Sequence, residues 1–130
     1  AITTSYPSGG TVNIHGGMVR SKNDFGVQIN GAGTLKITGG NITGWTGGIF
    51  NQTKESKNVT ISGGVITLSA AKPGQGQYAV NNCTIRGGTL RAKDQSCIVG
   101  DNVESVELRP IEGTDAEGYY VRTAGNPGTP

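Results

Sequence analysis

A pair of adjacent glycines returns at a nearly constant interval along this chain of 130 residues. The four pairs lie in similar phrases, TVNIHGGMV, TLKITGGNI, NVTISGGVI and NCTIRGGTL, and are Gly16-Gly17, Gly39-Gly40, Gly63-Gly64 and Gly87-Gly88. The first glycines of successive pairs are 23, 24 and 24 residues apart. A repeat of this length predicts a solenoid, in which equivalent residues of successive turns stack in columns.

Apolar residues occupy fixed positions around each glycine pair. The column four residues before the first glycine contains Val12, Leu35, Val59 and Cys83. The column two residues before it contains Ile14, Ile37, Ile61 and Ile85. The column three residues after it contains Val19, Ile42, Ile66 and Leu90. A polar residue separates the first two columns, and this alternation is typical of a strand with one buried face. Glycine permits a corner with positive φ or a close backbone approach. We therefore expect one strand before each pair and another after it.

A third apolar segment completes each repeat, at Phe25–Ile29, Gly47–Phe50, Tyr78–Val80 and Cys97–Val99. The sequence thus predicts an all-β fold, a short right-handed parallel β-helix of four to five turns with about three short strands per turn. We expect a single domain over residues 1–123, with turns near residues 11–33, 34–57, 58–81 and 82–102. The 23 glycines and the low hydrophobic content of 33% suit a solenoid, which needs few inward positions per turn.

Three segments depart from the repeat. Residues Ser69–Gln77 form an insertion in the third turn, and loops added to one turn of a solenoid often carry binding sites. Residues 103–123 are expected to form a polar C-terminal cap with Tyr119–Val121 as a last strand, because an uncovered end is an aggregation-prone edge. The opening Ala1–Ser8 and residues 124–130 resemble linkers, as in one module of a longer protein.

Asparagines recur where the third segments end, at Asn30, Asn51, Asn81 and Asn102. Stacked asparagines can hydrogen-bond to their equivalents in neighbouring turns and tolerate left-handed backbone. We expect these residues to form a structural ladder.

The two cysteines are predicted to lie in one turn. Cys83 shares the inward column of Val12, and Cys97 shares the column of Phe25 and Tyr78. A disulfide across the turn and two buried free thiols are both compatible with these positions.

The charged residues do not form a catalytic or metal-binding pattern. Hydrolysis of a glycosidic bond needs two carboxylates within about 5–10 Å, whereas Asp24 and Asp94 belong to the first and fourth turns. The remaining acids, read as a solvated face, gather mainly in the expected cap, at Glu104, Glu107, Glu112, Asp115 and Glu117. The only histidine, His15, has no second histidine, and the cysteines lack ligand spacing. We expect no enzymatic activity, no catalytic residues, no metal and no cofactor.

Charge and hydropathy exclude two kinds of partner. The net charge is +2 and charged residues make up 15% of the chain, so no basic stripe for nucleic acid is expected. No apolar run is long enough to span a bilayer, so no membrane partner is expected.

The residues that favour a ligand are aromatic and amide side chains. Sugar sites combine an aromatic platform with planar polar groups. Trp45, the only tryptophan, follows the second glycine pair in a polar stretch and is expected at the surface or at a corner. We take Trp45 and Tyr78 as candidate ligand-binding residues, together with Gln52, Gln75 and Gln77. The alternative is that Trp45 simply covers a corner or packs against the inserted loop.

The phrases ITGGNIT (Ile37–Thr43) and ISGGVIT (Ile61–Thr67) resemble the right-handed parallel β-helix repeats of large secreted and cell-surface proteins from Gram-positive gut bacteria. This resemblance covers roughly Thr11–Gly100, and the wider superfamily is that of pectate-lyase-like folds. It is specific for the fold and carries little information on function. The catalytic residues of enzyme members find no matching positions here.

The repeat, the linker-like termini and the lack of paired acids favour a non-catalytic extracellular or cell-surface module for adhesion or glycan binding. Its partners would be a polysaccharide, a host or cell-wall glycan, and other domains of the same polypeptide. A structural spacer or assembly module is the first alternative. A polysaccharide lyase or glycoside hydrolase is the second.

Overall fold

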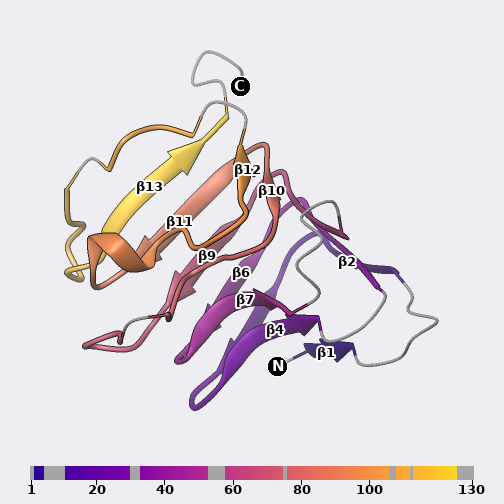
Figure 1. Cartoon of the computed structure of the whole chain (residues 1–130), viewed down its shortest axis with the longest axis horizontal. Coiled ribbons are helices and arrows are strands. Elements are labelled where there is room, and N and C mark those ends of the chain that lie inside the picture. The colour runs from indigo at the N-terminus through magenta and orange to yellow at the C-terminus, as the bar shows by residue number, and fades with distance from the viewer. Residues whose placement is uncertain are drawn as a thin grey trace.

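The computed structural model describes residues 2–4, 11–29, 33–52, 58–74, 76–105, 108–111 and 113–125. Over these residues the chain is an all-β parallel solenoid of about four turns, as the glycine repeat predicts (Figure 1). Three sheets form its faces, which we call the first, second and third face in the order in which each turn visits them. No helix in the described part of the chain is long and apolar enough to span a membrane.

The first face contains the strands that precede the glycine pairs. All its neighbouring strands pair in parallel, in the order β2 (Thr11–Ile14), β5 (Thr34–Ile37), β8 (Val59–Ile61), β10 (Thr84–Ile85) and β12 (Glu104–Ser105). The register places Val12 beside Leu35 and Leu35 beside Val59, which confirms the predicted inward column.

The second face contains the strands that follow the glycine pairs and one strand of opposite direction. Its order is β3 (Met18–Ser21), β6 (Asn41–Gly44), β9 (Val65–Leu68), β11 (Gly88–Ala92) and β13 (Tyr120–Ala124). The first four strands are parallel, whereas β13 returns antiparallel to β11. The last strand expected near Tyr119–Val121 therefore exists and extends to Ala124.

The third face is the least regular. It contains β1 (Ile2–Thr4), β4 (Phe25–Ile29) and β7 (Gly47–Asn51), all parallel. In the third and fourth turns, where full strands were expected, only isolated parallel bridges at Val80 and Val99 continue this face. The inserted loop precedes Val80, in place of a regular strand. A 3₁₀ helix, η2 (Gln95–Cys97), precedes Val99 in the same way, and its N-cap residue is Asp94.

The opening of the chain also differs from its linker-like appearance in sequence. The backbone of β1 pairs with β4 in register, Ile2 beside Val27 and Thr4 beside Ile29. The third face therefore begins one strand earlier than the other two faces.

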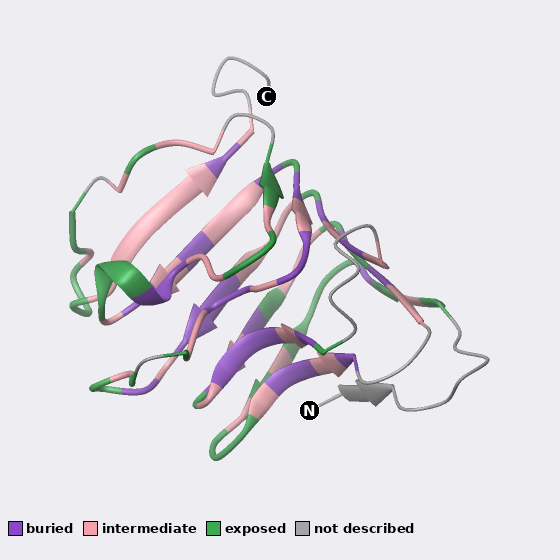
Figure 2. Cartoon of the chain, in the orientation of Figure 1, coloured by how far each residue is buried: buried purple, intermediate pink, exposed green. Residues whose placement is uncertain are grey.

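The core lies between the three faces, on whose strands the buried segments recur (Figure 2). It consists mainly of aliphatic side chains from successive turns. The isoleucine column is buried in every turn, from Ile14 at 6% exposure to Ile37, Ile61 and Ile85 at 1% or less. Each turn contributes few inward residues, so burial depends on the turns above and below. This explains how a chain with so few hydrophobic residues forms a continuous core.

The two glycines of each corner have different environments. The second glycine has positive φ throughout, for example +88° at Gly40. The first glycine lies against the preceding turn: a Cβ at Gly39 would stand 2.5 Å from the carbonyl oxygen of His15. Both properties predicted for the corner therefore occur: the second glycine has left-handed backbone, and from the second turn onward both glycines closely approach the preceding turn.

The expected asparagine ladder forms with a shift of one residue. Asn51 Nδ2 donates to the carbonyl of Asn82 at 2.8 Å, and Asn82 Nδ2 donates to the carbonyl of Asn51 at 2.6 Å. Asn81, the predicted partner, instead accepts from the Asn51 backbone N–H through Oδ1 at 3.0 Å. The shift follows from the bridge between Ile49 and Val80, which places Asn82 opposite Asn51. Asn30 lies outside the described residues.

Candidate functional site

The outward side of the second face carries a row of side chains four residues after each first glycine. The strand register places Arg20 beside Thr43, Thr43 beside Thr67 and Thr67 beside Arg91. Parallel strands are about 4.8 Å apart, so the row spans about 14 Å. Successive side chains of a strand point to opposite sides, and the intervening residues Ile42 and Ile66 are fully buried. The row therefore points away from the core, and within it Thr67 is only 3% exposed.

A groove of about 490 Å³ runs along this surface. Besides the row, it is lined by Met18, Lys22, Trp45, Ser69, Glu117 and Tyr119, among others. Its wall thus combines two aromatic rings, hydroxyl groups and charged side chains from the first, second, third and fourth turns and from the C-terminal segment.

Trp45 is the accessible aromatic platform of the groove. It follows β6 directly, and 46% of its surface is exposed. No hydrogen bond or ring contact within the described chain occupies its indole. The predicted surface position is thus where the structure places Trp45, and the ring is available to a ligand.

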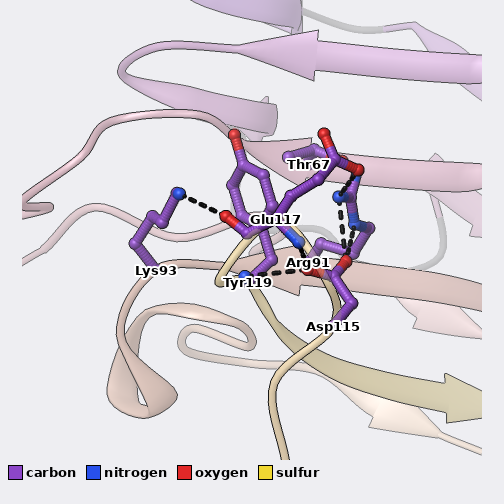
Figure 3. Close-up of polar contacts among 6 residues, drawn as sticks. All are labelled: Thr67, Arg91, Lys93, Asp115, Glu117 and Tyr119. Atoms are coloured by element: carbon purple, nitrogen blue, oxygen red, sulfur yellow. Dashed lines mark hydrogen bonds and ion pairs between the residues drawn. The ribbon is translucent and has the colours of Figure 1, made fainter.

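Arg91 is the most connected polar residue of the groove (Figure 3). Its Nε donates to Asp115 Oδ2 at 3.0 Å, and its Nη2 lies 2.9 Å from Glu117 Oε1. Its Nη1 donates to Thr67 Oγ1 at 3.3 Å. The guanidinium also lies 4.3 Å from the centre of the Tyr119 ring. Two carboxylates therefore compensate the charge of Arg91 within the protein.

Tyr119 is held in place by cations and is not a free platform. The Lys93 ammonium lies 4.4 Å from the ring centre and donates to the carbonyl of Glu117 at 2.8 Å. Together with Arg91 it fixes the ring on the groove wall.

Asp115 organises the segment that carries Tyr119. Its Oδ1 accepts from the backbone N–H groups of Glu117 and Tyr119, both at 3.0 Å. Desolvation acts to raise the pKa of Asp115, but these backbone N–H groups and Arg91 outweigh it, so the pKa lies below its usual value. The acids of the expected cap were interpreted as a solvated face. Asp115 departs from this, since its side chain is 27% exposed and binds Arg91. Glu104 is exposed, and Glu117 is 72% exposed although it also binds Arg91, whereas Glu107 and Glu112 lie outside the described residues.

Arg20 and Lys22 differ from Arg91 in having no compensating charge. Both are exposed, both line the groove, and neither forms an ion pair within the described residues. The end of the groove near β3 is therefore positively charged.

The other predicted ligand residues do not join Trp45. Gln77 and Tyr78 line a small pocket on the third face, of about 60 Å³, together with Phe25 and Phe50. Gln52 lines a larger neighbouring pocket that also contains Phe50. Gln75 lies outside the described residues. The structure thus groups Gln52, Gln77 and Tyr78 on one face and places Trp45 on another.

Several groove residues escaped the sequence interpretation, namely Arg20, Lys22, Thr43, Arg91 and Tyr119. A signal for three of them existed, because Arg20, Thr43 and Arg91 share one column of the repeat. Tyr119 had no such signal, since it arrives through the antiparallel return of β13.

The carboxylates of Asp24 and Asp94 have structural roles. Asp24 Oδ1 accepts from the Phe25 N–H at 2.8 Å, and Asp94 Oδ1 accepts from the Ser96 N–H at 2.9 Å and from its hydroxyl at 2.7 Å. The two Ser96 hydrogen bonds lower the pKa of Asp94. No group of three described histidine, cysteine or acidic residues is arranged to hold a metal ion.

Both cysteines are buried free thiols. Cys83 lies in the core, as its column predicts, and burial raises its pKa to about 12. A thiol with this pKa remains protonated and is a poor nucleophile at neutral pH.

Comparison with protein-family models, curated proteins and solved structures found no match to this chain.

Proposed function

We propose that this chain is a non-catalytic polysaccharide-binding module and that the groove on the second face is its glycan site. The observation that carries the proposal is the exposed ring of Trp45 at the wall of a groove lined with hydroxyl and guanidinium groups. An indole face packs against the C–H face of a sugar ring, while Thr43, Ser69 and Arg20 offer hydrogen bonds to its hydroxyls. An open groove suits a chain-like ligand, which can enter and leave at both ends.

The charge of the groove favours an acidic glycan. Arg20 lies in β3 and Lys22 directly follows that strand, both line the groove, and neither forms an ion pair within the described structure. A guanidinium binds a carboxylate through two parallel hydrogen bonds, which a neutral sugar cannot match. We therefore propose a uronate-containing or otherwise anionic polysaccharide as the ligand class.

The setting that suits this function is the cell surface or the extracellular space. The likeness of ITGGNIT and ISGGVIT to β-helix repeats of secreted bacterial proteins supports an adhesion role there, within a pectate-lyase-like superfamily. A spacer role would require only the solenoid and would not need an unoccupied tryptophan. A lyase or hydrolase would need acids in the groove besides Glu117, whose carboxylate binds Arg91.

Titration with oligogalacturonates tests the proposal, with tryptophan fluorescence as a site-specific signal because Trp45 is the only tryptophan. We expect binding to change the fluorescence of the intact chain. By calorimetry, Trp45→Ala should weaken binding by about tenfold, since the loss of a ring contact contributing about 1.4 kcal/mol is a factor of ten in affinity.

Two lysine variants distinguish the effect of a charge in the groove from the effect of the net charge of the protein. Lys22→Ala should weaken binding of the acidic oligosaccharide several-fold. The matched control is Lys36→Ala, because Lys36 is equally exposed but lies on the first face in β5. Unchanged affinity in Trp45→Ala would reject the groove as the site. Equal losses in both lysine variants would reject the acidic-glycan preference. Release of unsaturated oligosaccharides from the polymer would show a lyase instead.

A further inference from the structure

The third face carries a second pocket, separate from the groove, at the ends of its strands. Its volume is about 430 Å³, and Phe50, Asn51, Gln52, Asn81, Asn82 and Asp101 contribute to its lining. None of these residues lines the groove on the second face. The pocket is therefore built from the second, third and fourth turns alone.

The base of this pocket is rigid. Asn51 is fully buried and Asn82 is 7% exposed, and the two residues exchange the pair of side chain to backbone hydrogen bonds described above. Asn82 and Asn102, which also lines the pocket, have positive φ values of 47° and 54°, the only such values at described non-glycine residues. Left-handed backbone is unfavourable for most residues, and it persists at sites that the surrounding structure holds in place.

The rim of the pocket has polar groups that no other described residue binds. The carboxylate of Asp101 and the side-chain amide of Gln52 form no hydrogen bond or ion pair within the described part of the chain. Asn81 uses its Oδ1 for the Asn51 backbone, which leaves its amide nitrogen as a donor. A carboxylate and planar amides together accept and donate hydrogen bonds in the pattern that adjacent sugar hydroxyls require.

One side of the pocket is apolar and fixed. Phe50 stacks on Phe25 with ring centres 4.5 Å apart and an interplanar angle of 11°. Its partly exposed ring provides a surface for the C–H face of a sugar.

The charge of this pocket is opposite to that of the groove. Its described lining residues include one carboxylate and no cationic side chain, so this part of the pocket disfavours an anionic ligand. A single carboxylate is also too little for a calcium site, which uses several charged oxygen ligands.

From these observations we propose that the third-face pocket binds a neutral saccharide directly through adjacent hydroxyl groups. Asp101 and Gln52 hold the hydroxyls, the Asn81 amide donates to a sugar oxygen, and Phe50 contacts the ring. This second site does not depend on the groove. A polysaccharide containing both acidic and neutral residues would occupy both sites of one module and gain avidity.

The test is a titration of the whole chain with cellohexaose, mannohexaose and xylohexaose, followed by the backbone amide signals in NMR. At least one of these probes should shift the signals of Gln52, Asn81 and Asp101 without changing Trp45 fluorescence. Asp101→Asn and Gln52→Ala should each weaken this binding by about tenfold, as expected when a ligand loses hydrogen bonds to such groups. Gln95→Ala is the matched control, since Gln95 is exposed in the fourth turn outside this pocket.

The outcomes separate the two sites. Trp45→Ala should leave binding of the neutral probe unchanged, so failure of the proposed groove would not affect this result. The second site is rejected if none of the three probes shifts these signals, if the shifts lie along the groove, or if Gln52→Ala and Gln95→Ala behave alike. Loss of binding on removal of calcium by a chelator would also reject direct recognition. If Asp101→Asn fails to fold, Gln52→Ala decides the matter, because Gln52 is exposed and its side chain supports no described contact.

Discussion

Gly16 and Gly39 occupy the same position of the repeat but not the same environment. A Cβ at Gly39 would stand 2.5 Å from the His15 carbonyl oxygen, whereas no described atom lies within 4 Å of a Cβ at Gly16. Neither residue has positive φ. The need for glycine at this position therefore comes from the preceding turn and not from the corner itself.

We predict that Gly39→Ala destabilises the protein by about 1–3 kcal/mol, because the added methyl must displace backbone. Gly16→Ala should change the free energy of unfolding by no more than about 0.5 kcal/mol. Urea denaturation of the two variants and the wild type measures both values. Equal effects would show that stacking does not impose the glycine.

The burial of Cys83 makes the stability of the folded chain depend on pH in the alkaline range. Its thiol has a pKa of about 12 in the folded chain, against an ordinary value of 9.0. Between these two values the unfolded chain loses the proton and the folded chain keeps it, so stability falls as the pH rises through this window.

The variant Cys83→Val, which restores the valine found in this column at Val12 and Val59, removes that contribution. Between pH 8 and pH 10, under reducing conditions, the wild type should lose about 1 kcal/mol more of its unfolding free energy than the variant. Denaturation at the two pH values measures the difference. A variant that loses as much as the wild type would contradict the burial argument.

At the scale of elements, β13 closes the second face and also brings Tyr119 to the groove. The residues leading into it are held by Asp115, which binds Arg91 of β11 and two backbone N–H groups. Further along, Arg109 donates from its backbone to the Thr123 carbonyl and from its guanidinium to the Gly125 carbonyl. One end of the groove therefore depends on how firmly this antiparallel strand is held.

We predict that Asp115→Asn lowers the hydrogen-exchange protection of β13 while leaving β5 unchanged. The lowered pKa of Asp115 means that its contribution is present above the unfolded value of about 4 and is lost as the pH falls through the folded value. Protection of β13 in the wild type should therefore fall below about pH 4. Asp24→Asn serves as the control, because Asp24 caps the start of β4. A loss in β13 of the same size in this control would contradict the assignment.

Across the whole molecule, the first turn forms the edge of the first and second faces, whereas β1 covers it on the third face. Met18 is 68% exposed at the outer edge of the second face, and Ile14 is slightly exposed where Ile37 is buried. At the opposite end of that face, β13 covers β11. In a solenoid each turn is stabilised by its neighbours, so local stability should follow this difference.

Hydrogen exchange resolved by turn tests this expectation. Amides of residues 11–21 should exchange faster than those of residues 34–44 and 59–68. Uniform protection across all three ranges would instead show that the solenoid opens only as one cooperative unit.

The solenoid, its corners and its inward columns could be predicted because each depends on a pattern within one repeat. The burial of Ile37 and the positive φ of Gly40 could be predicted, for example, because each is a property of the residue's position in the repeat. Stacking then follows from the need of each short turn to bury its apolar side.

The composition of each candidate site depends on contacts between distant segments, which the repeat pattern does not specify. The sequence predicts that Trp45 and Tyr78 both bind the ligand, yet the structure places them in different pockets. Asn82 replaced Asn81 opposite Asn51 because the register resumes after the insertion at a position that local pattern does not specify. Tyr119 reaches the groove only because β13 reverses direction against β11. The sequence alone thus determined the solenoid, through a periodic local pattern, whereas the tertiary structure decided which side chains share a pocket, because that depends on register and chain reversal between distant segments.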